Sequence, residues 1–561
     1  MVVLVGAVVL TALMTYPLAF KLSGVGRIDS GDGQLSIWNV AWVAHAIIDS
    51  PARLYQANIF HPHADTLAYS ESNIGAGSLA LPAYWLTRNP YFAHNVVVLL
   101  AFTLSAAGAY FLVKHLTRHR GAAAVAAIAF AYCPYVFART AHIQLLMTAG
   151  LPFSLLAFHR VADSPTAGRA IVLGLVLVAQ ALSCAYYGVF VSCAVALGAL
   201  YYACDRGRWR DRRYWTALTL AALVAIWAVL PFLMPYVRLQ RESGFVRTID
   251  ETLAYSADWR AYFASAAWAH QWMLPWLGTW NDVLFPGFLT TLLGGFGFAL
   301  AVAGSRTPVH APAREPDDEA TAALLGRPFS SPVDVAWPRF YALMAVLAAW
   351  MSFGPRAGLY KVAYHLLPVF DFLRAPARFG VLVALALTVL MALGILRLAE
   401  RSRSSGRLFV LLAIAAVAEL ATLPLGFREV QPLPEAYRTL ATLRRGPVIE
   451  LPFYYNPIDF HRHTLYMLNS TGHWFPLING YSDHIPPDFR EMAIHLSSFP
   501  TLESFRILAP RGTRYAIFHL NLYDTRSRLR LMQRLDQYQP FLRPIFRQGD
   551  VWLYEIVDWP R

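Results

Sequence analysis

The sequence predicts a mainly α-helical, polytopic membrane protein, with a bundle of about eleven transmembrane helices over residues 1–425 and a small soluble α/β domain over residues 426–561. Two observations predict this fold class. Of the 561 residues, 57% are hydrophobic and only 14% are charged, and the apolar residues gather into long runs. Such runs are typical of membrane spans. After about residue 426 they give way to the shorter patterns of a soluble domain.

Each predicted span is an apolar run that approaches the roughly 20 residues needed to cross a bilayer. The runs lie at approximately residues 2–20, 92–113, 122–137, 146–158, 170–184, 189–203, 214–236, 284–302, 340–351, 381–398 and 408–425. The third, fourth and ninth are short, and the fifth and sixth could form one broken helix. The first run lacks a charged leading region and an A-x-A cleavage site, which favours a retained helix over a removed signal peptide.

The net charge of +13 does not indicate a nucleic-acid-binding protein, because the basic residues are spread over alternate connections between spans. By the positive-inside rule, these connections should be cytoplasmic. They contain Lys114, Arg118 and Arg120; Arg160 and Arg169; Arg206, Arg208, Arg210, Arg212 and Arg213; Arg306, Arg314 and Arg327; and Arg397, Arg401, Arg403 and Arg407. The first loop and the C-terminal domain then face outward. The inward stretch 308–337 contains APAREPDDEA and is predicted to be a flexible linker.

The four cysteines fall in or at the ends of predicted spans, so neither a disulfide framework nor a thiolate metal site is expected. They are Cys133, Cys184, Cys193 and Cys204. In the C-terminal domain, residues 448–453, 515–520 and 551–556 are predicted strands, and residues 526–538 have helical spacing. The chain has no convincing nucleotide-binding fingerprint, Walker motif or HExxH motif.

The first outward loop, residues 21–90, is long for a connection between spans, and long structured loops are usually functional. Its stretch IDSGDGQLSIWNVAW places two acids just before a predicted interfacial helix over residues 34–48. Leu35, Trp38 and Trp42 share one side of that helix and are expected to anchor it among lipid headgroups. A second short helix is predicted over residues 77–86. The loop should therefore lie on the membrane surface.

Asp29 and Asp32 are the catalytic candidates of this loop. A carboxylate at a partly desolvated membrane surface can act as a general base, because burial raises its pKa while nearby arginines lower it. The alternative interpretation is that both acids only cap the helix that follows, since Asp favours the first positions of a helix.

Arg374 and Arg378 are the phosphate-binding candidates, in the connection LPVFDFLRAPARFG. If that stretch is helical, their i,i+4 spacing puts them on one face, where they could clamp a phosphate. Arginines at the end of a span also commonly anchor lipid headgroups, so both interpretations stay open. Arg241 and Arg247, in the long outward loop 237–282, are weaker alternatives.

Other substrate-binding candidates lie in three further outward segments. His142 and Tyr187 could line a sugar pocket by hydrogen bonding and stacking, although interfacial His and Tyr often have no such role. Glu71 lies in the polar stretch 58–73. His473 lies in STGHWFPLINGYSDH, which could close over the membrane site, bind acceptor or simply dock the domain on the bundle. His61 and His63, near Asp65, are weak metal-ligand candidates, because their spacing matches no strong metal signature.

This layout of a first span, an outward loop that opens with acids, a multi-span bundle and an extracytoplasmic C-terminal domain resembles the GT-C superfamily of integral-membrane glycosyltransferases. The segments FHPHADTLAYSE, LRAPARFG and HWFPLINGYS also resemble a group of bacterial membrane proteins. In GT-C enzymes an Asp in the first outward loop is the catalytic base or acceptor-binding residue. The matching position is Asp32, in GDGQLSIW, with Asp29 the weaker match. Many members have a second acid directly after that Asp, and here the position is Gly33.

The resemblance implies an inverting glycosyltransferase of the bacterial inner membrane. It would take a sugar from a polyprenyl-phosphate-linked donor and transfer it to a glycan, lipid or protein acceptor, on the periplasmic or exterior side. No cofactor is firmly implied, and a divalent cation is left open. The main alternative is a non-catalytic relative that binds a polyprenyl lipid or a protein partner in cell-envelope assembly. A transporter is less favoured, because the sequence has no paired halves with corresponding broken helices.

Overall fold

The computed structural model describes residues 2–244, 247–303, 336–402 and 404–560. The predicted linker falls almost entirely outside these residues, as do the predicted inward arginines 306, 314, 327 and 403. The chain forms two compact units, and each is assembled from separate stretches of sequence. Unit 1 comprises Met1–Phe20, Val98–Phe232 and Phe245–Leu425, and unit 2 comprises Lys21–Val97, Leu233–Gly244 and Gly426–Arg561.

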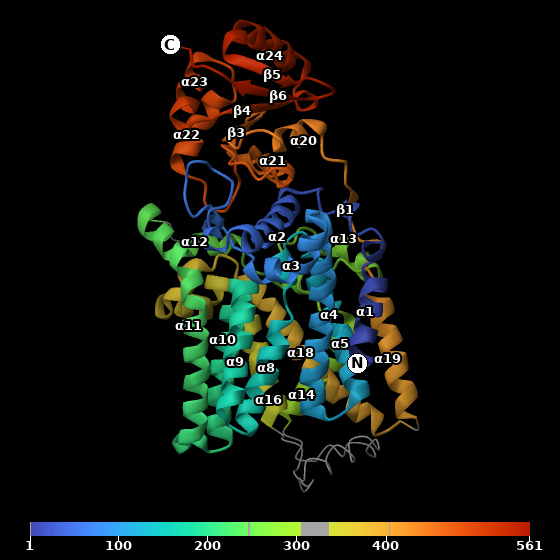
Figure 1. Cartoon of the computed structure of the whole chain (residues 1–561). Coiled ribbons are helices and arrows are strands. Elements are labelled where there is room, and N and C mark those ends of the chain that lie inside the picture. The colour runs from blue at the N-terminus through green and yellow to red at the C-terminus, as the bar shows by residue number, and fades with distance from the viewer. Residues whose placement is uncertain (1, 245–246, 304–335, 403, 561) are drawn as a thin grey trace. The chain divides into compact units, whose positions relative to one another are not determined.

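Every apolar run predicted as a span corresponds to one or more helices (Figure 1). These helices are α1 (Val2–Met14), α4 (Pro90–Thr117), α5 (Arg120–Ala131), α6 (Pro134–Phe137), α8 (Gly150–Asp163), α9 (Ala167–Ser183), α10 (Ala185–Asp205), α11 (Arg212–Ser243), α14 (Phe288–Val302), α16 (Ala336–Ser352), α18 (Gly380–Ala399) and α19 (Ser405–Leu420). Cys184 separates α9 from α10, so the fifth and sixth runs are two helices.

Five stretches are long and apolar enough to cross a membrane: Pro90–Thr117, Arg120–Phe137, Ala185–Asp205, Arg212–Ser243 and Pro376–Ala399. Helices α1, α9 and α14 are apolar but shorter. The described part of the chain therefore contains both full-length spans and shorter apolar helices that stand where the sequence predicts spans.

Small residues let the helices around α18 approach closely. A Cβ atom on Gly297 of α14 would lie 1.9 Å from the Leu390 carbonyl oxygen of α18, and one on Gly394 of α18 would lie 2.4 Å from the Leu293 carbonyl oxygen. Backbone-to-backbone packing of this kind is how membrane helices gain contact area without a hydrophobic driving force. The span that contains α18 is 94% buried, whereas the span of α11 is only 11% buried.

The connections of unit 1 contain short helices, namely α7 (Ile143–Leu146), α12 (Ile249–Ala254), α13 (Leu274–Leu277) and α17 (Leu359–Leu366). The connections also contain 3₁₀ helices, and residues Pro376–Phe379 form one immediately before α18. Arg374 precedes it and Arg378 lies within it, so the two arginines do not share one regular α-helix.

Unit 2 contains a four-stranded mixed sheet with the order β3-β4-β6-β5, in which β3 and β4 are parallel and the other pairs are antiparallel. The strands are β3 (Val448–Leu451), β4 (Tyr515–His519), β5 (Leu542–Phe546) and β6 (Val551–Ile556). Helices α20 (Glu435–Ala441), α21 (His463–Asn469), α22 (Pro487–Leu496), α23 (Leu502–Leu508) and α24 (Thr525–Gln537) accompany it. The three predicted strands and the predicted helix are confirmed, while β5 was not predicted.

The first loop folds into the same unit as the C-terminal segment. It forms α2 (Gly31–Asp49) and α3 (Ile74–Thr87), and its strand β1 (Val25–Gly26) pairs with β2 (Arg428–Glu429). The Phe60 amide donates to the Asn479 carbonyl at 3.0 Å, and the Leu477 amide donates to the Asn58 carbonyl at 2.8 Å. The loop therefore completes the fold of a domain that follows it by hundreds of residues.

The two tryptophans of α2 correct the expectation of lipid anchoring. Trp38 and Trp42 are only 1% and 5% exposed. The Trp38 indole donates to Asn58 Oδ1 at 3.2 Å, and Trp42 packs edge-on against Trp474 at 5.5 Å. A lipid anchor would leave these rings on the surface, but here they form the core between the first loop and the C-terminal segment.

Candidate active site

Asp32 lies in the first turn of α2, and its side chain is exposed. Ser30 is the N-cap of the helix: its backbone is extended, and its hydroxyl accepts a hydrogen bond from the Gly33 amide at 3.2 Å. Serine in this position satisfies one of the unpaired amides of the first turn. Neither acid is therefore the N-cap, and Asp32 is placed where the helix dipole favours a negative charge.

Asp29 has a different environment two residues before the helix. Its carboxylate pairs with the Arg27 guanidinium, with Nε to Oδ1 at 3.0 Å and a longer contact of 3.4 Å to Oδ2. Two guanidinium nitrogens therefore hold the Asp29 carboxylate beside Arg27. Asp32 and Asp29 both remain predicted catalytic residues, with Asp32 in the first turn of α2 and Asp29 paired with Arg27.

Gly33 follows Asp32 at a point where the preceding loop comes very close to the start of α2. A Cβ atom at this position would lie 1.8 Å from the Arg27 carbonyl oxygen and 2.9 Å from its Cβ. No side chain fits there unless the backbone moves. The backbone of the loop that enters α2 therefore requires glycine at position 33.

The start of α2 is fixed by the C-terminal segment of the same unit. Gln34 donates to the Ile28 carbonyl at 3.0 Å, and its Oε1 accepts a hydrogen bond from the Thr464 hydroxyl at 2.7 Å. A Cβ atom on Gly31 would lie 3.0 Å from the Cβ of His461. Asp32 is therefore presented by a firmly held helix terminus beside His461, a neighbour that sequence reasoning did not identify.

In unit 1, Arg374 and Arg378 both meet Tyr186. The Arg378 guanidinium lies over the Tyr186 ring, 4.2 Å from its centroid, and the Arg374 amide donates to the Tyr186 hydroxyl at 3.0 Å. The Arg374 guanidinium stacks on Tyr255 at 5.1 Å. Aromatic faces hold guanidinium groups in place while their N–H edges remain able to donate. The two arginines were expected to lie on one face of a helix. Instead, each guanidinium packs against the ring of a different tyrosine.

A buried ion pair lies close to these arginines. Arg139 pairs with Asp282 and lies over the Tyr135 ring at 4.8 Å. The charge of Arg378 acts on both Arg139 and Tyr135. The sequence analysis identified neither Arg139 nor Asp282 as a site residue. The only available signal was the presence of opposite charges in two connections, which does not identify a pair.

His142 and Tyr187 lie near Arg139 in unit 1 and contact the residues around it. The Tyr187 side chain is fully buried. Its hydroxyl donates to the Leu145 carbonyl at 3.0 Å and lies 2.9 Å from the Tyr135 hydroxyl. The half-buried His142 donates through its amide to the Arg139 carbonyl at 2.9 Å. Both remain predicted substrate-binding residues, and Tyr187 is also part of the frame around Arg139.

Of the remaining candidates, Glu71 is half-buried, and its backbone carbonyl accepts from Asn39 at 3.2 Å. His63 Nε2 lies 2.9 Å from Asp488 Oδ1. Burial lowers the pKa of His61. Among the described residues, no group of three or more His, Cys, Asp or Glu side chains could hold a metal ion. His61 and His63 are therefore not part of such a group among the described residues.

His473 is nearly buried in unit 2. Its Nδ1 accepts from the Phe475 amide at 2.9 Å, and its ring stacks on Tyr437 with centroids 5.9 Å apart. Burial, reinforced by the charge of Arg445, lowers its pKa to about 3. The imidazole is therefore neutral near pH 7 and suited to hydrogen bonding rather than to charge stabilisation.

Comparison with known proteins shows which solved structures this chain is similar to. No protein-family model matches the chain, and a search of curated proteins finds no match either. Among solved structures, the chain is similar to the oligosaccharyltransferase of Archaeoglobus fulgidus in complex with Zn and sulfate. The TM-score is 0.50 at 13% identity, over 98% of this chain and 72% of that chain.

Two structures of ArnT from Cupriavidus metallidurans also match, each with a TM-score of 0.40. The apo structure is 14% identical and covers 98% of this chain and 97% of its own. The structure bound to undecaprenyl phosphate is 13% identical, over 92% and 98% respectively. The likeness to the oligosaccharyltransferase establishes the fold. The chain is a membrane protein with a GT-C-type fold, as the sequence predicts.

Proposed function

We propose that this protein is an inverting membrane glycosyltransferase that transfers a sugar from a polyprenyl-phosphate-linked donor to an acceptor on the extracytoplasmic face. The observation that carries the proposal is the exposed Asp32 in the first turn of α2, at the loop position of the GT-C acid, in a chain that matches the fold of an oligosaccharyltransferase over 98% of its length. A fold alone does not define a reaction, so the roles below rest on individual residues.

In the proposed reaction, Asp32 accepts the proton of an acceptor hydroxyl as its oxygen attacks the anomeric carbon of the donor. The new glycosidic bond forms as the bond between that carbon and the phosphate oxygen breaks. The electron pair leaves with the polyprenyl phosphate, and the anomeric configuration inverts because the attack is a single displacement. Arg374 and Arg378 bind the phosphate and stabilise the charge that develops on it.

The test of Asp32 compares Asp32→Asn with Asp29→Asn in the full-length protein reconstituted in nanodiscs. Donors are screened as polyprenyl-phosphate sugars with radiolabelled sugar. Removal of the base should reduce turnover about 10²- to 10⁴-fold while donor affinity changes little. Asp29→Asn should keep most of the activity, because Asp29 is already paired with Arg27. Unchanged turnover of Asp32→Asn at equal protein would remove Asp32 from the mechanism.

The test of the arginines is a binding measurement that needs no sugar. Arg378→Ala should weaken binding of polyprenyl phosphate by about tenfold, the typical effect of one lost charge-assisted contact. Arg401→Ala, which removes an exposed arginine from another connection, is the control and should bind normally. Equal losses in the two variants would indicate a general effect of charge and would reject the assigned phosphate site.

The proposed reaction does not include a divalent cation, and a metal requirement can be tested separately. The oligosaccharyltransferase structure contains Zn, but the described residues of this chain do not provide three grouped ligands. No step is therefore assigned to a metal. Turnover that is abolished by chelation and restored by a divalent cation would reveal a metal requirement, while full turnover in chelator would show that the protein side chains suffice.

One observation favours the alternative of a non-catalytic lipid- or partner-binding protein in cell-envelope assembly. The backbone around Gly33 leaves no space for the second acid found in many GT-C enzymes. Saturable binding of polyprenyl phosphate, with no transfer from any donor and no effect of Asp32→Asn, would support this function over catalysis.

A further inference from the structure

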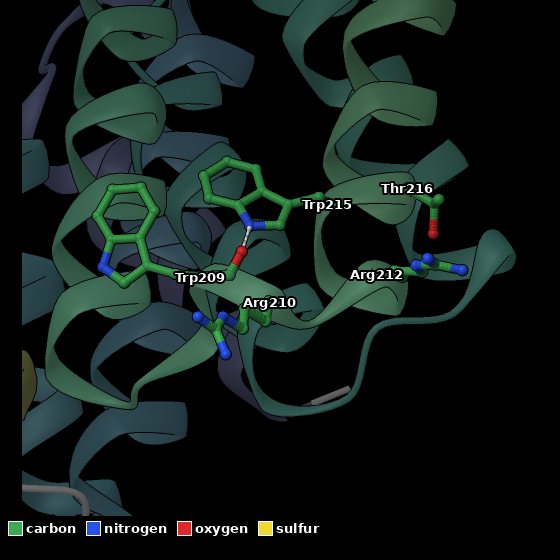
Figure 2. A pocket seen from close by; sticks show the side chains of 5 residues that line it. All are labelled: Trp209, Arg210, Arg212, Trp215 and Thr216. Carbon is green, nitrogen blue, oxygen red and sulfur yellow. Dashed lines mark hydrogen bonds between the residues drawn. The ribbon is translucent and has the colours of Figure 1, made fainter.

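A hollow of about 570 Å³ lies where α10 is joined to α11, and two tryptophans, two arginines and a threonine line it (Figure 2). The lining residues are Trp209, Arg210, Arg212, Trp215 and Thr216. They come from the 3₁₀ helix Arg208–Arg210 and the first turn of α11. Nothing in the proposed glycosyl transfer uses this hollow.

The wall of the hollow is rigid. The Trp215 indole donates to the Trp209 carbonyl at 3.1 Å, and the two rings lie 5.9 Å apart. Trp209 remains 53% exposed, so its ring is available to a ligand. The one carboxylate in this turn, that of Asp211, accepts from the Tyr214 amide at 3.2 Å and caps α11.

The arginines of this turn divide into two groups. Arg206 pairs with Asp163, and both Arg206 and Arg208 donate to the Ala162 carbonyl, so these two side chains attach the turn to the end of α8. Arg210 and Arg212 are exposed, and no acidic side chain among the described residues pairs with them. Their charges are therefore free to bind an anion within the hollow.

The helix that follows shows what surrounds the hollow. Helix α11 has a mean hydropathy of 2.4 in its most apolar window, yet that window is only 11% buried. Ile226 and Trp227 are 61% and 72% exposed. Such a surface is stable only if lipid chains cover it. The hollow lies at the N-terminal end of this span, where tryptophan and arginine normally meet the lipid headgroups.

We propose that the hollow binds the phosphate headgroup of an anionic membrane phospholipid, held by Arg210 and Arg212 beside the Trp209 and Trp215 side chains. Guanidinium groups bind phosphate through paired N–H donors, and arginines near the membrane surface attract anionic lipids. The acyl chains of the bound lipid lie along the exposed apolar surface of α11. The lipid belongs to the leaflet in which this connection lies.

The test measures lipid retention by the full-length protein with native mass spectrometry, during titration with phosphatidylglycerol or phosphatidylcholine. The variant Arg210→Gln/Arg212→Gln should reduce phosphatidylglycerol binding by at least about tenfold, given two lost charge-assisted contacts. Arg213→Gln is the matched control, because Arg213 is an exposed arginine of the same turn that does not line the hollow. It should bind the lipid as the parent protein does.

Equal weakening in Arg213→Gln and in Arg210→Gln or Arg212→Gln would overturn the proposal, because it would mean that only the summed charge matters. Equal retention of phosphatidylcholine would also overturn it. Competition by glycerol phosphate at concentrations comparable to the lipid would show that a free phosphate compound, not a membrane lipid, is the ligand. Unchanged melting temperatures of the double variant would exclude unfolding as the cause of lost binding.

Discussion

Units 1 and 2 satisfy their buried polar groups in different ways. In unit 1, the long helices pair their own backbone, and single side chains link neighbouring segments, as Ser105 contacts Thr148 at 2.9 Å and His159 contacts Tyr341 at 3.0 Å. In unit 2, loop backbone from the first 97 residues is paired with loop backbone beyond residue 426, as at Phe60 and Asn479. Unit 1 also contains a long-range backbone bond, from the Leu425 amide to the Tyr16 carbonyl at 3.0 Å, but its long helices pair their own backbone, whereas unit 2 joins irregular segments from both parts of the chain.

The centre of unit 2 contains a buried network of hydrogen bonds around Glu450. Glu450 on β3 is completely buried and contacts Tyr437 and His519, whose Nε2 lies 2.8 Å from its Oε2. Asn479 bonds the backbone of the same residue from both sides, at 2.7 and 2.9 Å. Burial raises the pKa of Glu450. Buried polar networks of this kind favour one arrangement strongly, because each unmade bond is expensive.

The largest expected effect is in unit 1, at the ion pair between Arg139 and Asp282, whose side chains are only 16% and 13% exposed. Asp282→Ala should destabilise the region around Arg139 by about 3 kcal/mol, because it leaves a nearly buried guanidinium without its partner. Hydrogen–deuterium exchange of peptides around residues 139 and 282 would measure the loss. The double variant Arg139→Met/Asp282→Ala should recover most of the protection. No change in Asp282→Ala would show that unit 1 does not rely on this pair.

A somewhat smaller effect is expected at Asn58 in unit 2, which bonds Trp38, Ser470 and the Phe475 carbonyl at 2.9 to 3.2 Å. Asn58→Ala should cost about 2 to 3 kcal/mol, since three buried groups lose a partner. Exchange should rise in both the first loop and the C-terminal segment. Ser497→Ala, which removes an exposed hydroxyl, should change neither. A rise confined to the first loop would contradict the joint folding of the two segments.

Two buried histidines should make the stability of unit 2 depend on pH. Burial lowers the pKa of His463 to about 4 and that of His473 to about 3, below the unfolded value of 6.5. Their neutral forms stabilise the fold above pH 6.5, and this contribution is lost as pH falls toward the folded values. Each histidine should cost about 1.4 kcal/mol per pH unit in that interval.

Thermal unfolding compared at about pH 7 and about pH 5.5 tests this expectation, because unit 2 should lose stability as protons bind the unfolded state. His473→Gln should reduce the slope of stability against pH by roughly the contribution of one histidine. An identical slope in parent and variant would show that His473 does not set it.

The smallest effect is expected at the surface. Lys21 and Glu429 form an ion pair at 3.0 Å beside the β1–β2 pairing, with side chains 53% and 77% exposed. Lys21→Ala should change the stability of unit 2 by no more than about 0.5 kcal/mol, because water and salt screen the pair. Exchange in strands β1 and β2 is the measurement. A loss as large as that of Asn58→Ala would mean that charge, rather than buried hydrogen bonding, holds this edge.

The helices could be predicted from the sequence because each membrane helix corresponds to a local apolar run, such as that of α18. It predicted α2 and the placement of Asp32 at its start, because acids and serine before an apolar stretch are local signals. It did not predict that Trp38 and Trp42 are buried. A tryptophan on one face of a helix looks the same in sequence whether lipid or protein covers it.

The same limit applies to the candidate sites. The stacking of Arg374 and Arg378 on Tyr255 and Tyr186 depends on turns around prolines rather than on helical spacing. The crowding at Gly33 depends on the carbonyl of Arg27, which no pattern of side chains reveals. Contacts between remote segments determine these features, and a single sequence carries no local record of them.

The discontinuous make-up of unit 2 has a consequence for biosynthesis. The stretch Lys21–Val97 leaves the ribosome long before Gly426–Arg561 is made. At about 5 to 20 residues per second, the first loop waits on the order of tens of seconds for its partner. During that time the faces of Trp38 and Trp42 have nothing of the C-terminal segment to pack against. Nearly all of unit 1 is synthesised in this interval, so its helices are complete before unit 2, which begins at Lys21, can be finished.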